Sequence, residues 1–406
     1  MRKQRALSIA DSRISELVLA ASDSKPISGL THDFYRYPAR FSPHFARAAI
    51  KAFTQAGDVV YDPFMGGGTT LVEASALGRK AIGTDINKLA VFITKVKTTV
   101  LTEKQLQLAI EWLNGLGYAL NLHNPPIRAE EWAILGYQRN ISGKSTWPIR
   151  KLTEFILAAA QNISEIRVRN FVRCVLLRTG QWALDCKETI PRAEEFKQQF
   201  SSTLLQMAQS AREYRKSIRD AIAFRKELSW ARGPKCLNCS AMDLEFDSLS
   251  AGLKPPTLIL TSPPYPGVHA LYHRWQVRGR RETPAPFWIA NCLNGNGASF
   301  YTFGDRKQQN LVSYFEKMRL VFKRLANISN SKTILVQLVA FSSPSWQLPE
   351  YLSAIGEAGF VEIFIRGYNN SSDGRIWRVV PNRKFYADYK GLIDASKEVV
   401  LLHRLA

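Results

Sequence analysis

The chain has 406 residues, 46% hydrophobic and 22% charged, so it can bury a large core and a wholly disordered chain is excluded. It contains 55 Lys and Arg residues against 34 Asp and Glu, a formal net charge of +21 at pH 7. A positive field of this size suits a polyanion, with nucleic acid ahead of an anionic membrane.

Other classes are excluded by what the sequence lacks. No run of about 18 apolar residues occurs, so we expect no membrane-spanning helix and no membrane partner. The basic N-terminus lacks the apolar stretch of a signal peptide. The five cysteines form no disulfide framework, and Cys236-x-x-Cys239 has no second CxxC partner. We therefore expect a cytoplasmic protein, nucleoid-associated in a prokaryote, without a metal site.

The first predicted elements form one βαβ unit. Ser42 suits a helix cap and Pro43 the first helical turn. A helix is expected over residues 42–53 and a strand over Asp58–Tyr61. The glycine turn, residues 62–70 (DPFMGGGTT), follows this strand, and then come a helix over Leu71–Leu77 and a second strand over Lys80–Thr84. The second strand ends on Asp85.

From about Leu101 to Lys235 the pattern changes to long helical segments, notably Leu152–Leu177 and Arg192–Trp230. Between Glu103 and Lys235 there are 21 Lys and Arg residues and 13 Asp and Glu residues, so this stretch is also basic. One apolar stripe comprises Phe196, Phe200, Leu204, Ala208, Ala211 and Ile218. The stretch is interpreted as a helical insertion. It either recognises the target sequence or forms an accessory bundle or dimer surface.

The α/β pattern then returns. A buried strand over Thr257–Thr261 runs into Ser262-Pro263-Pro264-Tyr265, and an irregular stretch over His269–Arg306 follows. Later helices are expected over Leu311–Leu325 and Pro349–Ala358, and strands over Thr333–Phe341, Val361–Arg366, Ile376–Val380 and Val399–His403. The pattern predicts an α/β fold with a mostly parallel sheet and an antiparallel edge. The expected division is 1–101, 102–235 and 236–406, with the helical insertion in the middle.

The glycine turn lets the backbone approach a ligand closely, although an ordinary tight turn has the same composition. No Gly-Lys-Ser/Thr follows it, so a phosphate-gripping P-loop is not indicated. Asp85, at the end of the next strand, is placed to hold ribose hydroxyls. Asp62 would repel a diphosphate and attract a sulfonium. The turn therefore favours S-adenosylmethionine over a dinucleotide.

The Ser-Pro-Pro-Tyr turn leaves a second strand, where ligands collect in open α/β folds. The Ser262 oxygen and a proline carbonyl are acceptors suited to the two hydrogens of an exocyclic amine on a base. Tyr265 offers a flat face on which a flipped-out base can stack. The structural alternative is a rigid turn with a packed tyrosine.

These two segments together resemble motifs I and IV of the amino-type DNA methyltransferases, which modify cytosine N4 or adenine N6. YPARFSP, residues 37–43, resembles the cofactor-facing segment that precedes motif I in a permuted arrangement, and Asp85 matches the acid of motif II. The resemblance implies a Rossmann-like methyltransferase fold, S-adenosylmethionine and base flipping. It assigns the cofactor to Tyr37, Asp62, Pro63, Phe64, Gly66, Gly68, Thr69 and Asp85, and catalysis to Ser262, Pro263, Pro264 and Tyr265.

The sequence departs from the family pattern at two places. The usual Gly-Ser-Gly is Gly66-Gly67-Gly68, and Asn238-Cys239 stands where many relatives have Gly-Asp. Serine at the head of the tetrapeptide is more often seen in the cytosine-N4 group, so cytosine N4 is favoured and adenine N6 is the alternative.

A basic stretch directly after the tetrapeptide mixes arginines with aromatics. Arginine bridges phosphates or reads guanine edges. DNA contacts are therefore predicted for Tyr272, Arg274, Arg278, Arg280 and Arg281. Tyr272 or Trp275 is expected to brace the gap left by a flipped base. The alternative is a solvated basic loop with a core tryptophan.

The predicted activity is direct methyl transfer to cytosine N4 in double-stranded DNA, without a covalent enzyme intermediate. The expected role is restriction–modification or epigenetic, with a cognate restriction endonuclease as a partner. Two competing hypotheses are a methyltransferase acting on RNA or a protein amide, and a non-catalytic nucleic-acid binder.

Overall fold

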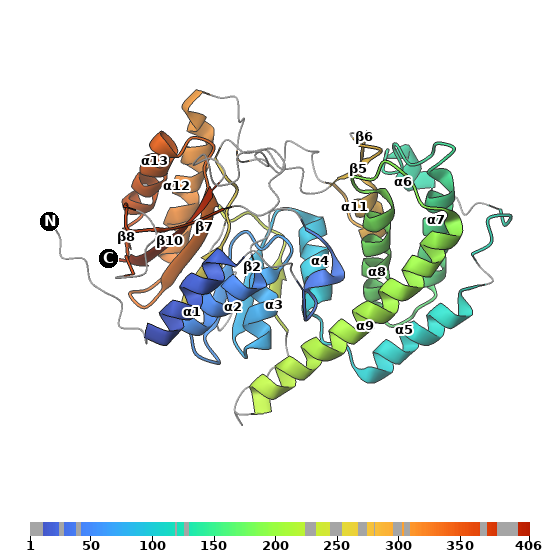
Figure 1. Ribbon diagram of the computed structural model, residues 1–406, viewed down its shortest axis with the longest axis horizontal. Coiled ribbons are helices and arrows are strands. Elements are labelled where there is room, and N and C mark those ends of the chain that lie inside the picture. Colours follow the sequence, from blue (N-terminus) through green and yellow to red (C-terminus); the bar gives the residue numbers. More distant parts are fainter. Residues whose placement is uncertain are drawn as a thin grey trace.

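The structure is a computed structural model. It describes residues 11–23, 28–37, 42–117, 120–125, 130–223, 233–243, 254–266, 274–279, 281–294, 303, 309–365, 372–379 and 397–406. An α/β part lies at one end of the molecule and a helical part at the other (Figure 1). None of the described helices is long and apolar enough to cross a bilayer.

The α/β part is built on one eight-stranded sheet. Its strands are β1 (Val59–Asp62), β2 (Lys80–Thr84), β3 (Lys235–Leu237), β4 (Leu258–Thr261), β7 (Ile334–Ala340), β8 (Phe360–Glu362), β9 (Ile376–Val379) and β10 (Lys397–Leu405). The spatial order is β3-β2-β1-β4-β7-β10-β8, and β9 also pairs with β10. The neighbours from β3 to β7 are parallel, while β10 is antiparallel to β7, β8 and β9. The predicted α/β fold, with a mostly parallel sheet and an antiparallel edge, is confirmed.

The centre of the sheet is the point where the strand order reverses. Tyr61 of β1 pairs with Ile82 of β2 on one side and with Ile259 of β4 on the other. From β1 the order runs outward through β2 and β3, and from β4 it runs the other way. In open α/β sheets ligands bind at such a switch point, beyond the carboxyl ends of the strands. The two predicted motifs leave the sheet there.

Helices cover both faces of the sheet. One face packs against α1 (Asp11–Ser22), α2 (Pro43–Phe53) and α3 (Thr69–Ala76), and the other against α12 (Val312–Asn327) and α13 (Pro344–Glu357). Successive strand residues alternate between the two cores, with Val60 in the first and Tyr61 in the second, as the period of two requires. Ser42 caps α2 as predicted, because its hydroxyl accepts the His44 N–H at 3.2 Å.

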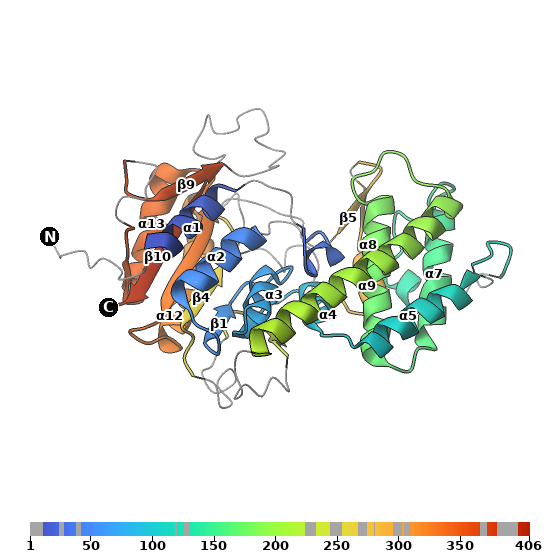
Figure 2. The same cartoon turned by 60° about the horizontal axis from the view of Figure 1, so that its bottom comes forward.

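The helical part has its own core. It contains α5 (Glu103–Gly115), α6 (Glu130–Ile134), α7 (Trp147–Gln161), α8 (Ile166–Leu184) and α9 (Ala193–Ala223), and α4 (Lys88–Thr98) lies between it and the sheet (Figures 1 and 2). A hairpin of β5 (Trp275–Val277) and β6 (Arg281–Thr283), and the helix α11 (Ala285–Ala290), also pack into this core. The segment that follows the Ser-Pro-Pro-Tyr turn in the sequence, residues 275–279 and 281–290, therefore packs against the helical part.

Three expectations from the sequence need correction. The helical segment expected over Leu152–Leu177 is divided between α7 and α8, because Glu165 accepts the Arg167 N–H at 3.2 Å and begins a new helix. The stretch expected to be irregular holds the β5–β6 hairpin and α11. Helix α13 begins at Pro344, whose missing N–H is harmless in the first turn, rather than at Pro349.

Candidate active site

Asp62, the last residue of β1, links the two predicted motifs. One carboxylate oxygen accepts hydrogen bonds from the Thr261 hydroxyl at 2.7 Å and the Phe64 N–H at 3.1 Å. The other accepts the Thr70 hydroxyl at 2.6 Å. Because Thr261 is the last residue of β4 and Thr70 lies in the first turn of α3, this carboxylate joins both strands to the glycine turn.

The Asp62 side chain is directed into the protein, with only 1% of the residue exposed. Burial raises its pKa to about 6, and the hydrogen bonds from Thr70, Thr261 and Phe64 act in the opposite direction. The carboxylate is therefore ionised at neutral pH and is neutralised in mild acid. The geometry adds a bracing role to the predicted attraction for a cofactor cation.

The glycine turn has a backbone that other residues adopt rarely. Gly66 and Gly68 have φ values of +46° and +76°, in the left-handed region. A Cβ on Gly67 would lie 2.7 Å from the Tyr37 Cβ, and one on Gly68 would lie 2.7 Å from the Thr94 Cγ2. The close approach of Tyr37 explains in physical terms why glycine stands at position 67.

Tyr37 packs against this turn and is 6% exposed. Its hydroxyl accepts a hydrogen bond from the Asn87 amide at 3.0 Å. Lys97 of α4 is buried, and its ammonium donates to the Gly67 carbonyl at 3.0 Å and to the Tyr35 carbonyl at 3.4 Å. The turn is thus fixed by side chains from two neighbouring segments.

Asp85 follows β2 and is partly exposed. Its two carboxylate oxygens accept the Gly66 N–H at 3.0 Å and the Asn87 N–H at 2.8 Å. Burial raises its pKa to about 6. Asn238, the departure from the family pattern, donates its side-chain amide to the carbonyls of Asp85 at 2.9 Å and Ile86 at 3.0 Å. Asn238 therefore holds the loop that carries Asp85.

The Ser-Pro-Pro-Tyr turn contains a directed chain of hydroxyl groups. The Tyr265 hydroxyl donates to a carboxylate oxygen of Glu398 at 2.8 Å, and the Ser262 hydroxyl donates to the Tyr265 oxygen at 3.0 Å. A carboxylate can only accept hydrogen bonds, so the single hydroxyl hydrogen of Tyr265 is used in the bond to Glu398. In the bond between Ser262 and Tyr265, Ser262 must therefore be the donor. The remaining lone pairs of Ser262 are left to accept.

The two prolines are not equivalent. The Pro264 carbonyl accepts the Tyr314 hydroxyl at 2.7 Å, so Pro263 provides the better proline acceptor for an incoming amine. Behind the turn, Glu398 forms a buried ion pair with Arg378 at 3.0 Å, in which the side chains are 8% and 6% exposed. Arg378 also donates to the Ala21 carbonyl at 3.2 Å.

Several of these residues were missed from the sequence. Glu398 and Arg378 are charged residues in strands β10 and β9, each directly beside apolar strand residues, and a buried charge in a strand is a signal that a polar partner is near. Phe303 gave no signal. Its ring centre lies 5.7 Å from that of Phe64 and 5.9 Å from that of Tyr314, so it connects the side chains beside the two turns.

The residues predicted to contact DNA have different environments. Arg274 forms an ion pair with Glu282 at 3.3 Å, whereas Arg278 and Arg281 are exposed. Trp275 is 2% exposed and donates its indole N–H to the Tyr35 hydroxyl at 2.9 Å. The prediction that it braces a flipped-base gap is therefore wrong, and it is a core tryptophan. Tyr272 and Arg280 lie outside the described residues.

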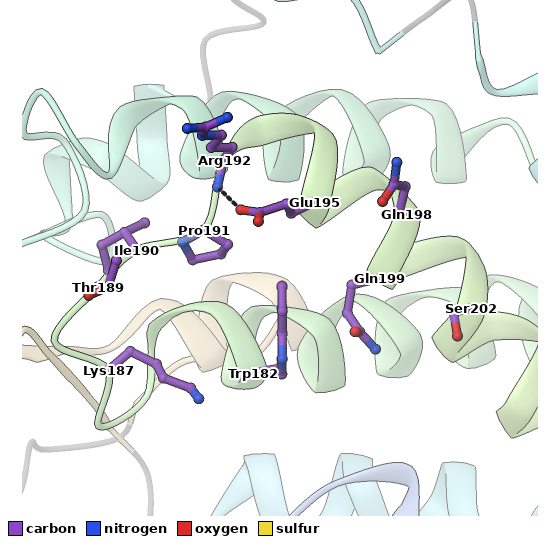
Figure 3. Close-up of a pocket in the computed structure, with 10 residues that line it drawn as sticks. All are labelled: Trp182, Lys187, Thr189, Ile190, Pro191, Arg192, Glu195, Gln198, Gln199 and Ser202. Carbon is purple, nitrogen blue, oxygen red and sulfur yellow. Dashed lines mark hydrogen bonds between the residues drawn. The ribbon is translucent and has the colours of Figure 1, made fainter.

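A hollow of about 870 Å³ lies between the end of α8 and the start of α9 (Figure 3). Trp182 points into it from α8, and Gln198, Gln199 and Ser202 line it from α9. None of the predicted site residues that the structure describes lines it. It is therefore a feature of the helical part and not of the predicted active site.

The residues at the switch point fit S-adenosylmethionine. Phe64 and Gly66 are half-buried at the end of β1, and Asp85 is partly exposed at the end of β2. A carboxylate has about four acceptor positions, and backbone N–H groups occupy two of those on Asp85, so it retains capacity for ribose hydroxyls.

Comparisons with known proteins agree with this interpretation. Residues 18–95 match the family model described as DNA methylase, of the N6/N4 type. The chain is 43% identical over 84 residues to the type II methyltransferase M.MvaI of Kocuria varians, covering 20% of this chain and 18% of that protein. It is 35% identical over 88 residues to the orphan methyltransferase M.BamHII of Bacillus amyloliquefaciens, covering 21% and 31%.

The matched stretch spans less than a third of the length of these relatives. Among solved structures, an rRNA methyltransferase, AviRa from Streptomyces viridochromogenes, has a TM-score of 0.35 at 11% identity, covering 91% of this chain and 89% of that one. The family-model match includes the glycine turn and Asp85, so over residues 18–95 the chain is similar in sequence to the amino-type (N4/N6) DNA methyltransferases that its motifs resemble.

Proposed function

We propose that this chain transfers a methyl group from S-adenosylmethionine to the exocyclic N4 amine of cytosine in double-stranded DNA. The observation that carries the proposal is the Glu398–Tyr265–Ser262 hydroxyl chain, which lies at the switch point. Thr261, the residue directly before Ser262, donates a hydrogen bond to Asp62 and so joins this chain to the glycine turn. The hydroxyl chain leaves an acceptor where the exocyclic amine of a flipped base is to be held.

The roles of the residues follow from their hydrogen bonds. Ser262 accepts one amine hydrogen and the Pro263 carbonyl accepts the other, which turns the nitrogen lone pair out of conjugation with the ring. Tyr265 stacks on the base. S-adenosylmethionine, when bound, supplies the methyl group. Holding the two reactants in place provides most of the acceleration, so no nucleophilic cysteine is required.

Two further assignments complete the proposal. The serine at the head of the tetrapeptide favours cytosine N4 over adenine N6. The basic helical part, α5 to α9, is assigned to target recognition. A restriction–modification or epigenetic role, with a cognate endonuclease in the first case, is supported by the names of the relatives, of which one is a type II and another an orphan methyltransferase.

The direct test is product identification. The protein, purified from a host without DNA methyltransferases, is incubated with unmethylated duplex DNA and S-adenosylmethionine, and the digested nucleosides are identified by mass. The proposal predicts N4-methylcytosine, and none from the matched Tyr265→Ala protein. N6-methyladenine would overturn the base assignment alone. No methylated base in DNA, with methylated RNA or protein in parallel reactions, would overturn the substrate class.

A further inference from the structure

A second hollow, of about 570 Å³, lies where the β5–β6 hairpin meets the loop before α7. The loop contributes Asn140, Ser142 and Lys144, and the hairpin contributes Arg278 and Arg281. The loop comes from the helical part and the hairpin from the chain that follows the Ser-Pro-Pro-Tyr turn. This composite surface is called the hairpin cleft below.

The charge of the hairpin cleft has one sign. Lys144, Arg278 and Arg281 are all exposed. None of the nine described residues that line the hollow is acidic, and the other polar members are hydroxyl and amide groups. The acid on the hairpin, Glu282, is engaged by Arg274. Such a lining suits a ligand with several negative oxygens.

The backbone of the hairpin gives an independent observation. Arg278 has a φ of +49° and is followed by Gly279 at +85°. The left-handed conformation costs a residue with a Cβ about 1 kcal/mol, and Gly or Asn is the usual occupant. A long cation held at this position, on an exposed turn, indicates that its side chain serves a ligand.

The hairpin is also firmly placed. The Gln276 N–H donates to the Asp185 carboxylate at 3.0 Å, the Gln276 carbonyl accepts the Cys186 N–H at 2.8 Å, and the Asn140 amide donates to the Glu282 carbonyl at 2.7 Å. Trp275 anchors the first strand to Tyr35, which lies two residues before Tyr37, and Tyr37 packs against the glycine turn. The hairpin cleft therefore has a fixed position relative to the active site.

The distance to the active site is limited by the chain. Thirteen residue steps separate Tyr265 from Arg278, and a fully extended chain of that length spans at most about 45 Å. One turn of B-DNA is about 34 Å. About one and a half turns of duplex on one side of the base presented to Tyr265 are therefore long enough to reach the hairpin cleft.

We propose that the hairpin cleft binds the backbone phosphates of the duplex that presents the target base, through Lys144, Arg278 and Arg281. The proposal rests on the proposed function, since it takes DNA as the substrate. It makes loop and hairpin one sequence-independent clamp, and leaves base reading to other residues of the helical part.

The test removes three charges from the hairpin cleft and compares the result with removal of three elsewhere. The cleft variant is Lys144→Ala, Arg278→Gly and Arg281→Ala, in which glycine relieves the left-handed position. The control variant is Lys80→Ala, Lys323→Ala and Lys332→Ala, three exposed residues of the α/β part. The Kd for a duplex of about 30 base pairs is measured by fluorescence anisotropy at several salt concentrations.

The cleft variant is expected to bind more weakly, with the slope of log Kd against log salt reduced by about 2 to 3, because each neutralised phosphate contributes about 0.9. The control variant is expected to keep most of the wild-type slope. Equal slopes in the two variants would overturn the proposed role of the hairpin cleft. The proposed function is tested separately, because it stands as long as the wild-type protein methylates DNA. Preference of the wild type for RNA over duplex DNA would overturn the partner. Unchanged cofactor affinity by calorimetry shows that both variants are folded.

Discussion

The two turns at the centre of the sheet are built in different ways. The glycine turn takes its main hydrogen bonds from residues close in sequence, since Thr70 lies eight residues after Asp62, and Asp85 lies nineteen after Gly66. The Ser-Pro-Pro-Tyr turn depends on distant ones, because Tyr265 relies on Glu398, 133 residues away.

This difference predicts which substitutions should impair cofactor binding and which should impair catalysis. The glycine turn is a unit that one βαβ segment carries almost complete, so changes within that segment should affect cofactor binding. The residues that support the Ser-Pro-Pro-Tyr turn lie far from it in the sequence. Substitutions at those distant residues should therefore impair catalysis while leaving the cofactor site intact. The Asp62–Thr261 hydrogen bond is the point at which the two turns share a support.

The largest effect is expected at this shared support. Asp62→Ala leaves the Thr261 hydroxyl and the Phe64 N–H without their acceptor, whereas the Thr70 hydroxyl keeps the Leu260 carbonyl at 3.3 Å. Buried polar groups left unpaired cost roughly 1–3 kcal/mol each, so we expect a destabilisation of at least about 2 kcal/mol by chemical denaturation and loss of measurable S-adenosylmethionine binding by calorimetry. Folded variant protein that binds the cofactor with unchanged affinity would contradict this.

The next largest effect separates the two turns. Tyr265→Ala removes the stacking face and the hydroxyl that orients Ser262, while the glycine turn is untouched. We expect methylation to slow by at least about 100-fold, with the cofactor Kd unchanged. Tyr265→Phe is the matched control: it keeps the face and should retain part of the activity. If Tyr265→Ala turned over normally, stacking would have no part in the mechanism.

The same contrast explains what the sequence could predict. Both turns, the Ser42 cap and strands β1, β2 and β4 were predictable because each is a short contiguous pattern with its own turn chemistry. Glu398 and Tyr314 were not assigned, because their partners lie 133 and 50 residues away and only folding brings them together. Trp275 was misassigned for the same reason: its place against Gly180, where a Cβ would lie 2.6 Å from the indole, is a tertiary contact.

A moderate effect is expected at the remote support of the second turn. In Glu398→Gln the side-chain NH₂ group can point either at Arg378 or at Tyr265. Pointing at Tyr265 is favoured because it keeps the NH₂ group away from the Arg378 cation. The Tyr265 oxygen then accepts a hydrogen bond from this NH₂ group, and the direction of every hydrogen bond in the hydroxyl chain is reversed. Ser262 would then direct its hydrogen at the target amine. We expect kcat to fall about tenfold to 100-fold with the KM for S-adenosylmethionine unchanged.

A double variant tests the reason for the Glu398 effect. In the Tyr265→Phe background the hydroxyl chain is already absent, so adding Glu398→Gln should cost little more in kcat. If the two changes instead multiplied, Glu398 would act through the general stability of β10, and the difference between the two turns would be one of packing and not of hydrogen-bond direction.

The smallest effect concerns the pH dependence of cofactor binding. The pKa of Asp85 is raised to about 6, so its carboxylate is mostly ionised at pH 7.5 and about one-tenth ionised at pH 5. A protonated carboxyl loses acceptor capacity and charge, so the Kd for S-adenosylmethionine should be about tenfold higher at pH 5. Asp62, also with a pKa of about 6, adds to this dependence. Calorimetry on Asp85→Asn should therefore show weaker binding at pH 7.5 and a smaller ratio between the two pH values. An identical ratio in wild type and variant would assign the whole dependence to Asp62, and the glycine turn would then share its titrating group with the second turn.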